Sequence, residues 1–289
     1  MKKLTIIVLT WNGLENLKTL IPSIISQTYK NFELLVCVNG SVDGSDRWLK
    51  KQKIKTIILK QNQGFSGGNN VALETVKTPF VALVSDDIKL EPDCIQELMA
   101  FMGSKPHVGA VQPKILSFNG KYLESTGLEV TYGSMIATKG KYDSPNNCNE
   151  NMKVIGTHAA CSVYRMDVLH KIKFFDENFN PVYYEDADLA FRIGKAGYEQ
   201  WYVAGATAFH KSGDATKRMG YEARLSWHRN RYRFLKKHWT SGMWLKTLPF
   251  LLPITIFYTI KHDKAYFVAT WEFLTGKLKT NDMTAWSSY

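Results

Sequence analysis

The sequence is short of cysteine and of long apolar runs, and each shortage excludes a class of protein. Its four cysteines among 289 residues are widely scattered and form no CxxC pair. We therefore expect reduced thiols of a cytosolic protein, with neither a disulfide framework nor a zinc scaffold. The apolar stretch 247–260 holds two prolines, and it is shorter than the ~20 residues that a membrane-spanning helix needs.

The N-terminus lacks the features that would complete a secretory signal. Two lysines precede the apolar run Leu4–Thr10, but the run is short and no small-residue cleavage site follows it. We interpret the run as the first buried strand of the fold, with a signal peptide as the weaker alternative. A hydrophobic content of 45% is enough to build a sizeable core, so a wholly disordered chain is excluded.

Acidic residues are too few to balance the basic ones, and the formal net charge is +11. Residues 214–289 hold 13 Lys and Arg but only 5 Asp and Glu, whereas residues 1–213 hold 24 and 21. The excess could serve nucleic acid, an anionic membrane or a phosphorylated substrate. In 224–239 the basic residues alternate with aromatic ones, and a proline-containing apolar stretch follows, which fits a membrane surface better than nucleic acid.

Apolar runs alternate with helical patterns in the first part of the chain, which is typical of βαβ units and a mainly parallel sheet. The expected strands are 4–10, 32–38, 56–59 and 80–84, and the expected helices lie near 14–27, 44–51, 66–77 and 92–103. Ligands of such sheets bind at the carboxyl ends of the strands. Residues 104–213 show shorter strands and one helix near 187–197, so we expect a domain 1–213 with halves 1–103 and 104–213, followed by a basic helical region 214–289.

Two clusters of acids stand where chemistry is expected. Asp86 and Asp87 follow the apolar run 81–84, so their carboxylates could hold Mg²⁺ or Mn²⁺ at a strand end; the alternative is a turn with an acidic helix cap. Glu185, Asp186 and Asp188 precede a helical pattern. Asp188 or Asp186 could cap that helix. Crowded carboxylates also raise one another's pKa and supply candidate general bases.

Two further features are weaker on their own. The segment 62–70 joins a strand to a helix through three glycines and three asparagines, which would permit close approach of an anionic ligand, but it does not match the dinucleotide pattern GxGxxG. His210 follows a short apolar run and could either bind a metal or be a structural histidine.

The order and spacing of these motifs resemble those of the inverting family 2 glycosyltransferases. The motifs in chain order are TIIVLTWNG, CVNGSVDGS, NQGFSGGNN, VSDD, YYEDADLAFR and AFHKSG. The resemblance covers residues 4 to about 240 and is strongest to the bacterial branch with rhamnosyl- and galactofuranosyltransferases of surface polysaccharides. It implies the α/β GT-A fold, a Rossmann-like nucleotide-diphospho-sugar transferase with a mixed sheet flanked by helices.

The resemblance also implies a role for particular residues. Asp186 would be the catalytic base, and Asp87 with His210 would bind Mn²⁺ or Mg²⁺. Donor binding would fall to Thr10, Asn12, Asn39, Ser41, Gly64, Phe65, Asn69 and Asp86. The acceptor site would include Glu185, His158 and Asp188.

Three positions depart from the family pattern. Val38 replaces the first acid of the nucleotide-binding motif, which leaves base recognition to Asn39. Ser85 replaces the first acid or Asn of the metal motif, so only one metal carboxylate is expected. Trp11 with Asn12 preserves the aromatic–amide pair of the family.

The implied activity is a metal-dependent, single-displacement transfer of a sugar with inversion. The donor would be dTDP-rhamnose or else a UDP-sugar, and the acceptor a growing lipid-linked bacterial glycan. The basic C-terminal region would bind the inner face of the cell membrane, and its helices could also pair in a homodimer. Two alternatives remain at this point: a catalytically silent sugar-nucleotide-binding or scaffold protein on the same fold, and a nucleic-acid binder.

Overall fold

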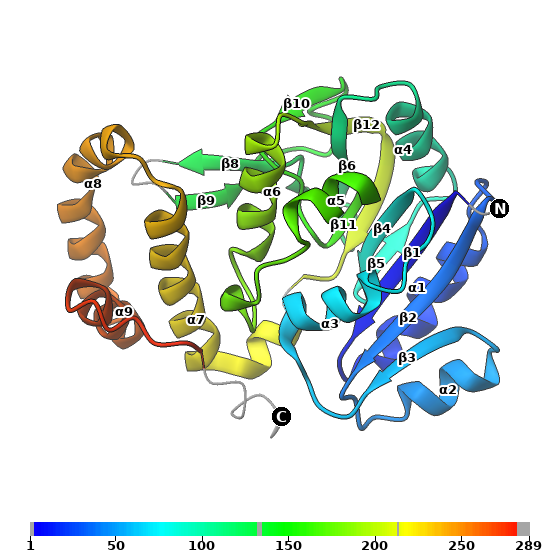
Figure 1. Ribbon diagram of the computed structural model, residues 1–289, viewed down its shortest axis with the longest axis horizontal. Helices are drawn as coiled ribbons and strands as arrows, with labels where there is room; N and C mark the ends of the chain where they lie inside the picture. The colour runs from blue at the N-terminus through cyan, green and yellow to red at the C-terminus, as the bar shows by residue number, and fades with distance from the viewer. Residues whose placement is uncertain (1–2, 132–134, 213, 282–289) are drawn as a thin grey trace.

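The computed structural model describes residues 3–131, 135–212 and 214–281. A large mixed sheet crosses the molecule with helices on both faces, and helices α7, α8 and α9 stand at one end (Figure 1). The strands are β1 Leu4–Thr10, β2 Phe32–Asn39, β3 Lys55–Leu59, β4 Phe80–Ser85, β5 Ile88–Leu90, β6 Val108–Ser117, β7 Leu123–Ser125, β8 Leu128–Thr131, β9 Met135–Thr138, β10 Met152–Val154, β11 Cys161–Arg165 and β12 Glu199–His210. The helices are α1 Leu14–Ile25, α2 Ser45–Lys51, α3 Gly64–Leu73, α4 Cys94–Gly103, α5 Met166–Ile172, the 3₁₀ turn η1 Glu177–Phe179, α6 Glu185–Lys195, α7 Asp214–His238, α8 Ser241–Ile260 and α9 Lys264–Leu274.

The first half is the predicted parallel sheet. Strands run in the order β3-β2-β1-β4, each pair parallel, so β1 lies between β2 and β4. The chain leaves β1 for β2 on one side and reaches β4 on the other, which makes the carboxyl ends of β1 and β4 the switch point where ligands bind in open α/β sheets. Thr10 ends β1 and Ser85 ends β4.

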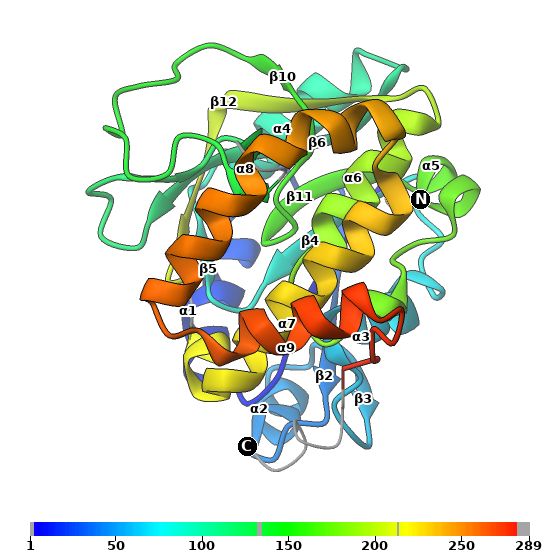
Figure 2. The same cartoon turned by 90° about the vertical axis from the view of Figure 1, so that its left-hand side faces the viewer.

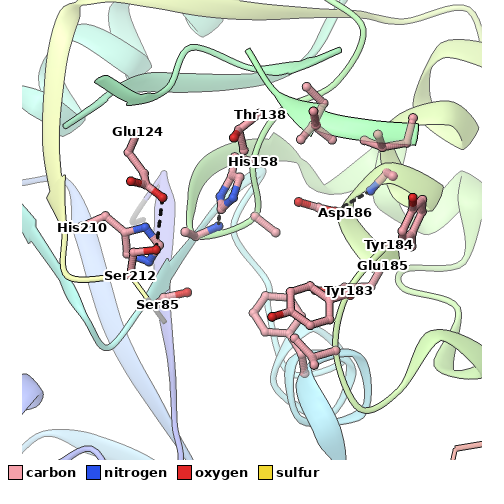
Figure 3. Close-up of a pocket in the computed structure, with 18 of the residues that line it drawn as sticks. Ser85, Glu124, Thr138, His158, Tyr183, Tyr184, Glu185, Asp186, His210 and Ser212 are labelled. Atoms are coloured by element: carbon pink, nitrogen blue, oxygen red, sulfur yellow. Dashed lines mark hydrogen bonds between the residues drawn. The ribbon is translucent and has the colours of Figure 1, made fainter. Parts of the chain in front are cut away.

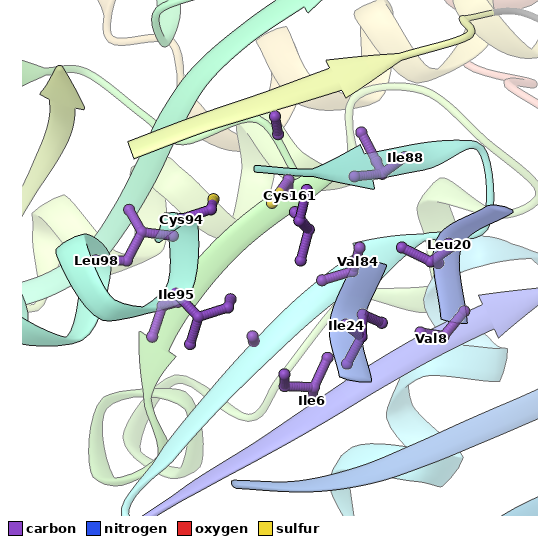
Figure 4. Packing of buried hydrophobic residues seen from close by; sticks show 14 of the residues in the cluster. Ile6, Val8, Leu20, Ile24, Val84, Ile88, Cys94, Ile95, Leu98 and Cys161 are labelled. Atoms are coloured by element: carbon purple, nitrogen blue, oxygen red, sulfur yellow. The ribbon is translucent and has the colours of Figure 1, made fainter. Parts of the chain in front are cut away.

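Continuous apolar sequence explains why these strands lie in the interior. Ile6 and Val8 of β1 are fully buried, and Leu20 and Ile24 of α1 pack against them one helical turn apart (Figure 4). Burying each such side chain contributes about 1.5–3 kcal/mol. The buried spacing in α1 is the i, i+4 stripe that fixes the helix against one face of the sheet.

The second half extends the same sheet with mixed strand directions. β11 is antiparallel to both β4 and β6, whereas β12 runs parallel to β6. Short β5 pairs antiparallel with the far end of β12, and the register places His210 opposite Ile88. The hairpin β8–β9 forms a separate two-stranded sheet. This mixed sheet with flanking helices agrees with the fold predicted from the sequence.

The C-terminal helices pack on one another and on α6 (Figure 2). α7 is kinked at Gly220, whose backbone is not helical (φ 49°, ψ −112°). Prolines 249 and 253 both fall inside α8. Among the described residues no single helix has the length and apolar composition to cross a membrane. One pair of helical segments meets these criteria only when taken together, Ser241–Thr247 with Pro249–Ile260, and the pair is bent by 53°.

Candidate active site

A cavity of about 480 Å³ opens between the sheet and the loop that leads into α6. Five of the residues singled out from the sequence line it: Asp87, His158, Glu185, Asp186 and His210. Figure 3 shows His210 on the sheet side, Asp186 on the loop side and His158 between them. We call the two sides the sheet wall and the loop wall. Phe65, predicted to bind the donor, also lines the cavity.

Asp86 and Asp87 point to different partners. Asp86 accepts a hydrogen bond from the Thr10 hydroxyl at 2.5 Å and packs so closely over Gly13 that a Cβ there would lie 2.0 Å from the carboxylate. Asp87 faces the cavity. The two residues form a turn between β4 and β5 and precede no helix, so the alternative of an acidic helix cap is wrong here.

Asp87 and His210 are brought together by the backbone. The β5–β12 ladder ends at the Ile88–His210 pair, and the Lys211 N–H donates to the Asp87 carbonyl at 3.0 Å. The Asp87 carboxylate then lies 3.3 Å from His210 Nε2. Burial alone would raise the pKa of Asp87, but the hydrogen bond and charge of His210 outweigh it and lower that pKa. Burial alone would lower the pKa of His210, but the hydrogen bond and charge of Asp87 outweigh it and raise that pKa.

These two side chains suit a divalent cation that keeps positions for a ligand. Two atoms 3.3 Å apart can be neighbours on one ion with bonds of about 2.1 Å. His210 Nδ1 is buried without a partner among the described residues. No group of three or more His, Cys, Asp or Glu able to hold a metal occurs in the described part of the chain, so further ligands would come from a bound diphosphate or water.

Glu185 and Asp186 are adjacent but differ in environment. Burial, and next the charge of Asp186, raise the pKa of Glu185 well above its usual range, and Glu185 Oε2 has no partner among the described residues. Asp186 accepts the Ala187 N–H at 2.8 Å. Neither caps α6 with its side chain; the N-cap is Tyr184, in a left-handed conformation (φ 69°). Because the raised pKa of Glu185 favours its protonated form, which cannot accept a proton, Asp186 is the better candidate for the base.

His158 is held by the backbone at the centre of the cavity. Its ring Nδ1 accepts a hydrogen bond from the Ala160 backbone N–H at 3.2 Å. The backbone N–H of His158 donates to Gln112 Oε1 at 2.7 Å. Burial lowers the pKa of His158, and the charge of His210 lowers it further against the opposing charge of Asp186. The ring therefore favours the neutral form, able to donate from Nε2.

Asp188 does not reach the cavity. It is fully buried, and its carboxylate bonds to Arg192, Lys237 and His238, each at 2.7 Å. Burial would raise the pKa of Asp188, but the hydrogen bond from His238 and the positive charges lower it. These contacts tie α6 to α7. They correct the expectation that Asp188 shapes the acceptor site or caps the helix.

The first predicted donor-binding loops form one hydrogen-bonded unit. The Asn12 N–H donates to the Ser41 hydroxyl at 3.0 Å, and Asn12 Oδ1 accepts the Val42 N–H at 2.9 Å. Asp43 accepts the Leu14 N–H at 2.8 Å. A second hollow of about 360 Å³ adjoins this unit. The loops after β1 and β2 are thus joined before any ligand binds.

Asn39 and Asn69 hold the backbone instead of facing a cavity. Asn39 Nδ2 donates to Asn62 Oδ1 and to the Gly64 carbonyl, and Asn39 Oδ1 accepts the Gln63 N–H. Asn69 donates to the Phe65 carbonyl at 2.9 Å. Both amides are buried. This corrects the expectation that Asn39 recognises the base: its donors are used to shape the glycine-rich loop.

Gly64 is required by its surroundings. Its φ of +74° is left-handed, and a Cβ would lie 2.5 Å from Asn180 Oδ1. The glycine lets α3 begin directly against the loop 180–181, where the Phe65 N–H donates to the Pro181 carbonyl at 2.9 Å. Phe65 is thereby placed at the cavity.

Several lining residues were not foreseen from the sequence. Glu124, Lys141 and Ser212 are bonded together on the sheet wall. Tyr183 belongs to the loop wall, and Trp227 reaches the cavity from α7. Glu124 and Lys141 carry no local motif because they meet only where the turn 139–142 packs against β7. Trp227 did carry a signal, since it belongs to the aromatic, basic segment, but that segment was interpreted as a membrane surface alone.

Known proteins resemble the chain in sequence. The model of the glycosyl transferase family 2 matches residues 5–173. An uncharacterized protein y4gI of Sinorhizobium fredii is 25% identical over 82% of this chain and 27% of its own length. An N-acetylglucosaminyl-diphospho-decaprenol L-rhamnosyltransferase of Mycobacterium tuberculosis is 23% identical over 86% of this chain and 89% of its own. The chain thus spans about a quarter of the first relative and most of the second.

Solved structures share the fold at low sequence identity. GalNAc-T7 with UDP, GalNAc and Mn²⁺ superposes with a TM-score of 0.66 at 10% identity, over 83% of this chain and 49% of its own. A mannosyltransferase of Pyrobaculum calidifontis with GDP-Man and Mn²⁺ gives 0.60 at 15% identity, over 99% and 78%. Together with the family match, these likenesses identify the chain as a transferase: it belongs to glycosyltransferase family 2 and has the GT-A fold.

Proposed function

We propose that this protein transfers a sugar from a nucleotide-sugar donor to a lipid-linked glycan in one displacement with inversion. The observation that carries the proposal is that the candidate base and the candidate metal-binding pair face the same cavity from its two opposite sides. Asp186 faces the cavity from the loop wall, and the Asp87–His210 pair faces it from the sheet wall. A base on one side and a pair able to hold a cation for the leaving diphosphate on the other is the arrangement that direct displacement at an anomeric carbon requires.

In this mechanism the acceptor hydroxyl attacks the anomeric carbon while its proton passes to an Asp186 carboxylate oxygen. The bond from that carbon to the diphosphate breaks, and its electron pair stays on the departing phosphate oxygen. His158, in its neutral form, lies where it can donate a hydrogen bond to a substrate hydroxyl. Tyr183 and Trp227 cover the loop side of the cavity, which would exclude water from the reacting atoms.

Asp87 and His210 would hold Mn²⁺ or Mg²⁺. When bound, such an ion neutralises charge on the leaving diphosphate, as a Lewis acid worth several kcal/mol. The residues themselves contribute an ionised carboxylate and an imidazole fixed by the β5–β12 ladder. Two solved structures of the same fold contain Mn²⁺, which supports the choice of cation.

The substrates are proposed from the named relatives. One is named an N-acetylglucosaminyl-diphospho-decaprenol L-rhamnosyltransferase, a name that gives its acceptor. Another is WfaP of Escherichia coli, named a UDP-Glc:α-D-GlcNAc-diphosphoundecaprenol β-1,3-glucosyltransferase. It is 29% identical over 47% of this chain and 56% of its own length. We infer a polyprenyl-diphosphate-linked glycan as acceptor and dTDP-rhamnose as donor, with a UDP-hexose as the second choice.

The direct test is a transfer assay on the full chain. Purified protein with Mn²⁺ is given dTDP-rhamnose or UDP-sugars and a short-chain polyprenyl-diphosphate glycan, and the product is identified by mass spectrometry and its anomeric configuration by NMR. An inverted glycosidic product supports the proposal. Donor binding without transfer or donor hydrolysis under any of these conditions would favour a catalytically silent relative.

We also propose that the exposed faces of α8 and α9 dock on the anionic inner face of the cell membrane. Large apolar side chains stand in solvent there; Leu252, Ile260, Trp271 and Leu274 are each 68–73% exposed. Exposed lysines surround them: Lys246, Lys261, Lys264, Lys277 and Lys279. The two acids described in 241–281 are occupied, Asp263 near His228 and Glu272 in a bidentate bond with Arg229.

Apolar insertion and basic charge act together at membranes, and each basic residue near an anionic leaflet adds about 1 kcal/mol. Co-sedimentation with vesicles of phosphatidylglycerol, compared with phosphatidylcholine alone, tests the surface. The variant Lys261→Gln/Lys264→Gln/Trp271→Ser should lose binding, while Lys50→Gln/Lys51→Gln on α2 should bind as the wild type does. Equal pelleting of wild type with both vesicle types at low salt would refute this surface.

A further inference from the structure

Charge at the cavity is unbalanced in a way that the proposed mechanism does not resolve. Four carboxyl groups line it, those of Asp87, Glu124, Glu185 and Asp186. Among the described lining residues Lys141 is the one Lys or Arg. A nucleoside diphosphate is itself a multiple anion, so a leaving group in this cavity needs more positive charge than His210 and one cation supply.

Lys141 is fixed by its backbone. Residues 139–142 form a turn that is hydrogen-bonded to the segment 123–126: the Thr126 N–H donates to the Lys139 carbonyl at 3.0 Å, and the Leu123 N–H donates to the Asp143 carbonyl at 2.9 Å. Glu124 lies between these bonds on one segment and Lys141 on the other. These bonds hold the turn against β7, which brings the side chains of Glu124 and Lys141 together.

The side chains of Lys141 and Ser212 are both hydrogen-bonded to that of Glu124. Lys141 Nζ donates to Glu124 Oε1 at 3.0 Å, and the same oxygen accepts the Ser212 hydroxyl at 3.1 Å. Glu124 is nearly buried, with its side chain 5% exposed, whereas that of Lys141 is 37% exposed. Figure 3 shows the Glu124–Ser212 bond directly beside His210. The ammonium is thus anchored close to the strand end that carries the proposed metal histidine.

An anchored lysine retains binding capacity. An ammonium group has three N–H donors, and its bond to Glu124 uses one of them. Anchoring also removes part of the rotamer entropy that a free lysine loses on binding an anion. A lysine paired with a buried carboxylate at the edge of a cavity is therefore prepared to take a second anionic partner.

We propose that Lys141 binds a phosphate oxygen of the nucleoside diphosphate, and that Glu124 and Ser212 position its ammonium beside His210. The inference rests on the proposed function, because it gives the leaving group of that reaction a second cationic contact. Lys141 would touch the ligand, whereas Glu124 acts only through Lys141.

The test is calorimetric titration of the full-length protein with UDP, dTDP and GDP in the presence of Mn²⁺. Lys141→Gln should weaken the affinity for the preferred diphosphate about tenfold or more, the value of a hydrogen bond to a charged group. Lys141→Arg should retain most of the affinity. Lys121→Gln, an exposed lysine of the same region, is the matched control and should bind as the wild type does.

Kinetics separate contact from positioning. Lys141→Gln should raise the KM for the donor and leave that for the acceptor unchanged. Glu124→Gln should give a smaller loss, and combining both changes should cost no more than Lys141→Gln alone, since one contact is removed in each case.

Two failures are distinguishable. If the wild type binds none of the three diphosphates, the proposed function itself fails, and this inference with it. If the wild type binds one of them and Lys141→Gln binds it equally well, only the role of Lys141 is overturned.

Discussion

The two walls of the cavity are held in different ways. On the sheet wall, Asp87 and His210 stand at strand ends, and a backbone ladder sets their separation. On the loop wall, Tyr183 and Tyr184 both have positive φ values, 77° and 69°. Non-glycine residues adopt that conformation only where surrounding contacts enforce it.

Helix α7 supplies much of that enforcement. Asn230, fully buried, donates from Nδ2 to three carbonyls of the loop: those of Phe179 at 2.6 Å, Val182 at 3.0 Å and Tyr183 at 2.9 Å. The loop wall therefore depends on a residue of α7 that lies 47 to 51 positions further along the chain. A regular sheet fixes functional residues through its own hydrogen bonds, whereas an irregular loop needs a partner from elsewhere.

The substitution Asp186→Asn should distinguish the roles of the two walls with the largest effect. Removing the base should lower turnover by about 10²–10⁴-fold, while the affinity for a nucleoside diphosphate stays unchanged because the sheet wall is intact. Steady-state transfer rates and calorimetry measure the two quantities. Turnover close to that of the wild type would refute the assignment of the base.

The second prediction changes the sheet wall and leaves the loop wall intact. Asp87→Asn, or removal of divalent cations with a chelator, should lower both diphosphate affinity and turnover, by about 10²-fold or more for the several kcal/mol that a Lewis acid supplies. Adding Mn²⁺ back should restore the wild type and not the variant. Full activity of the wild type in chelator would remove the metal from the mechanism.

Asn230→Ala tests whether α7 maintains the loop wall. Leaving buried carbonyls unpaired should cost about 1–3 kcal/mol of the free energy of unfolding, and a displaced Asp186 should slow turnover by about tenfold or more. Diphosphate affinity should not change. The matched control is Asn146→Ala at an exposed asparagine. Loss of stability with normal turnover would mean that the loop holds its conformation without Asn230.

A smaller effect is expected from pH at the joint between α7 and α9. Burial, against the opposing bond and charge of Asp263, lowers the pKa of His228 to about 4 from 6.5. Below pH 6.5 the unfolded chain takes up a proton that the folded chain refuses until about pH 4, so stability should fall as pH falls through this window. The groups around the ring are Asp263, Arg224, Arg231, Tyr258 and Tyr266.

Thermal melts between pH 4 and 7.5 measure this slope. His228→Gln should flatten it, because the substituted side chain does not titrate. His262→Gln, at an exposed histidine, should leave the slope as in the wild type. An unchanged slope in His228→Gln would show that other groups produce it.

The sequence predicted the sheet wall better than the loop wall. Apolar runs located β1, β2 and β4 within one residue at each end, and strand ends that meet at a switch point must bring their polar residues together. Asn39 was nevertheless assigned to the wrong task, because a buried amide satisfies the nearest backbone and that backbone belongs to a loop whose course a pattern cannot give.

Long-range packing explains what was missed. Asp188 carries the same charge as Asp186 and lies two positions away, so the two acids face different sides of α6; only the position of α7 decides which side is a cavity. Glu124 and Lys141 meet where a turn packs against β7, and Trp227 reaches the cavity from α7. The catalytic, metal and donor roles given to the residues at the cavity stay predictions until they are measured.

The pairing of β5 with β12 also has a consequence for synthesis of the protein. Asp87 and His210 are joined by a ladder whose second strand is made more than a hundred residues later, and β12 inserts between β10 and β6 in the finished sheet. The first two hundred residues hold the strands from β3 to β6 of the mixed sheet, with the β6 edge uncovered and no histidine beside Asp87. The cavity is therefore completed late, by contacts of high sequence separation, which are the slow ones in folding. A nascent chain halted before residue 210 should accumulate as a stable but ligand-blind intermediate.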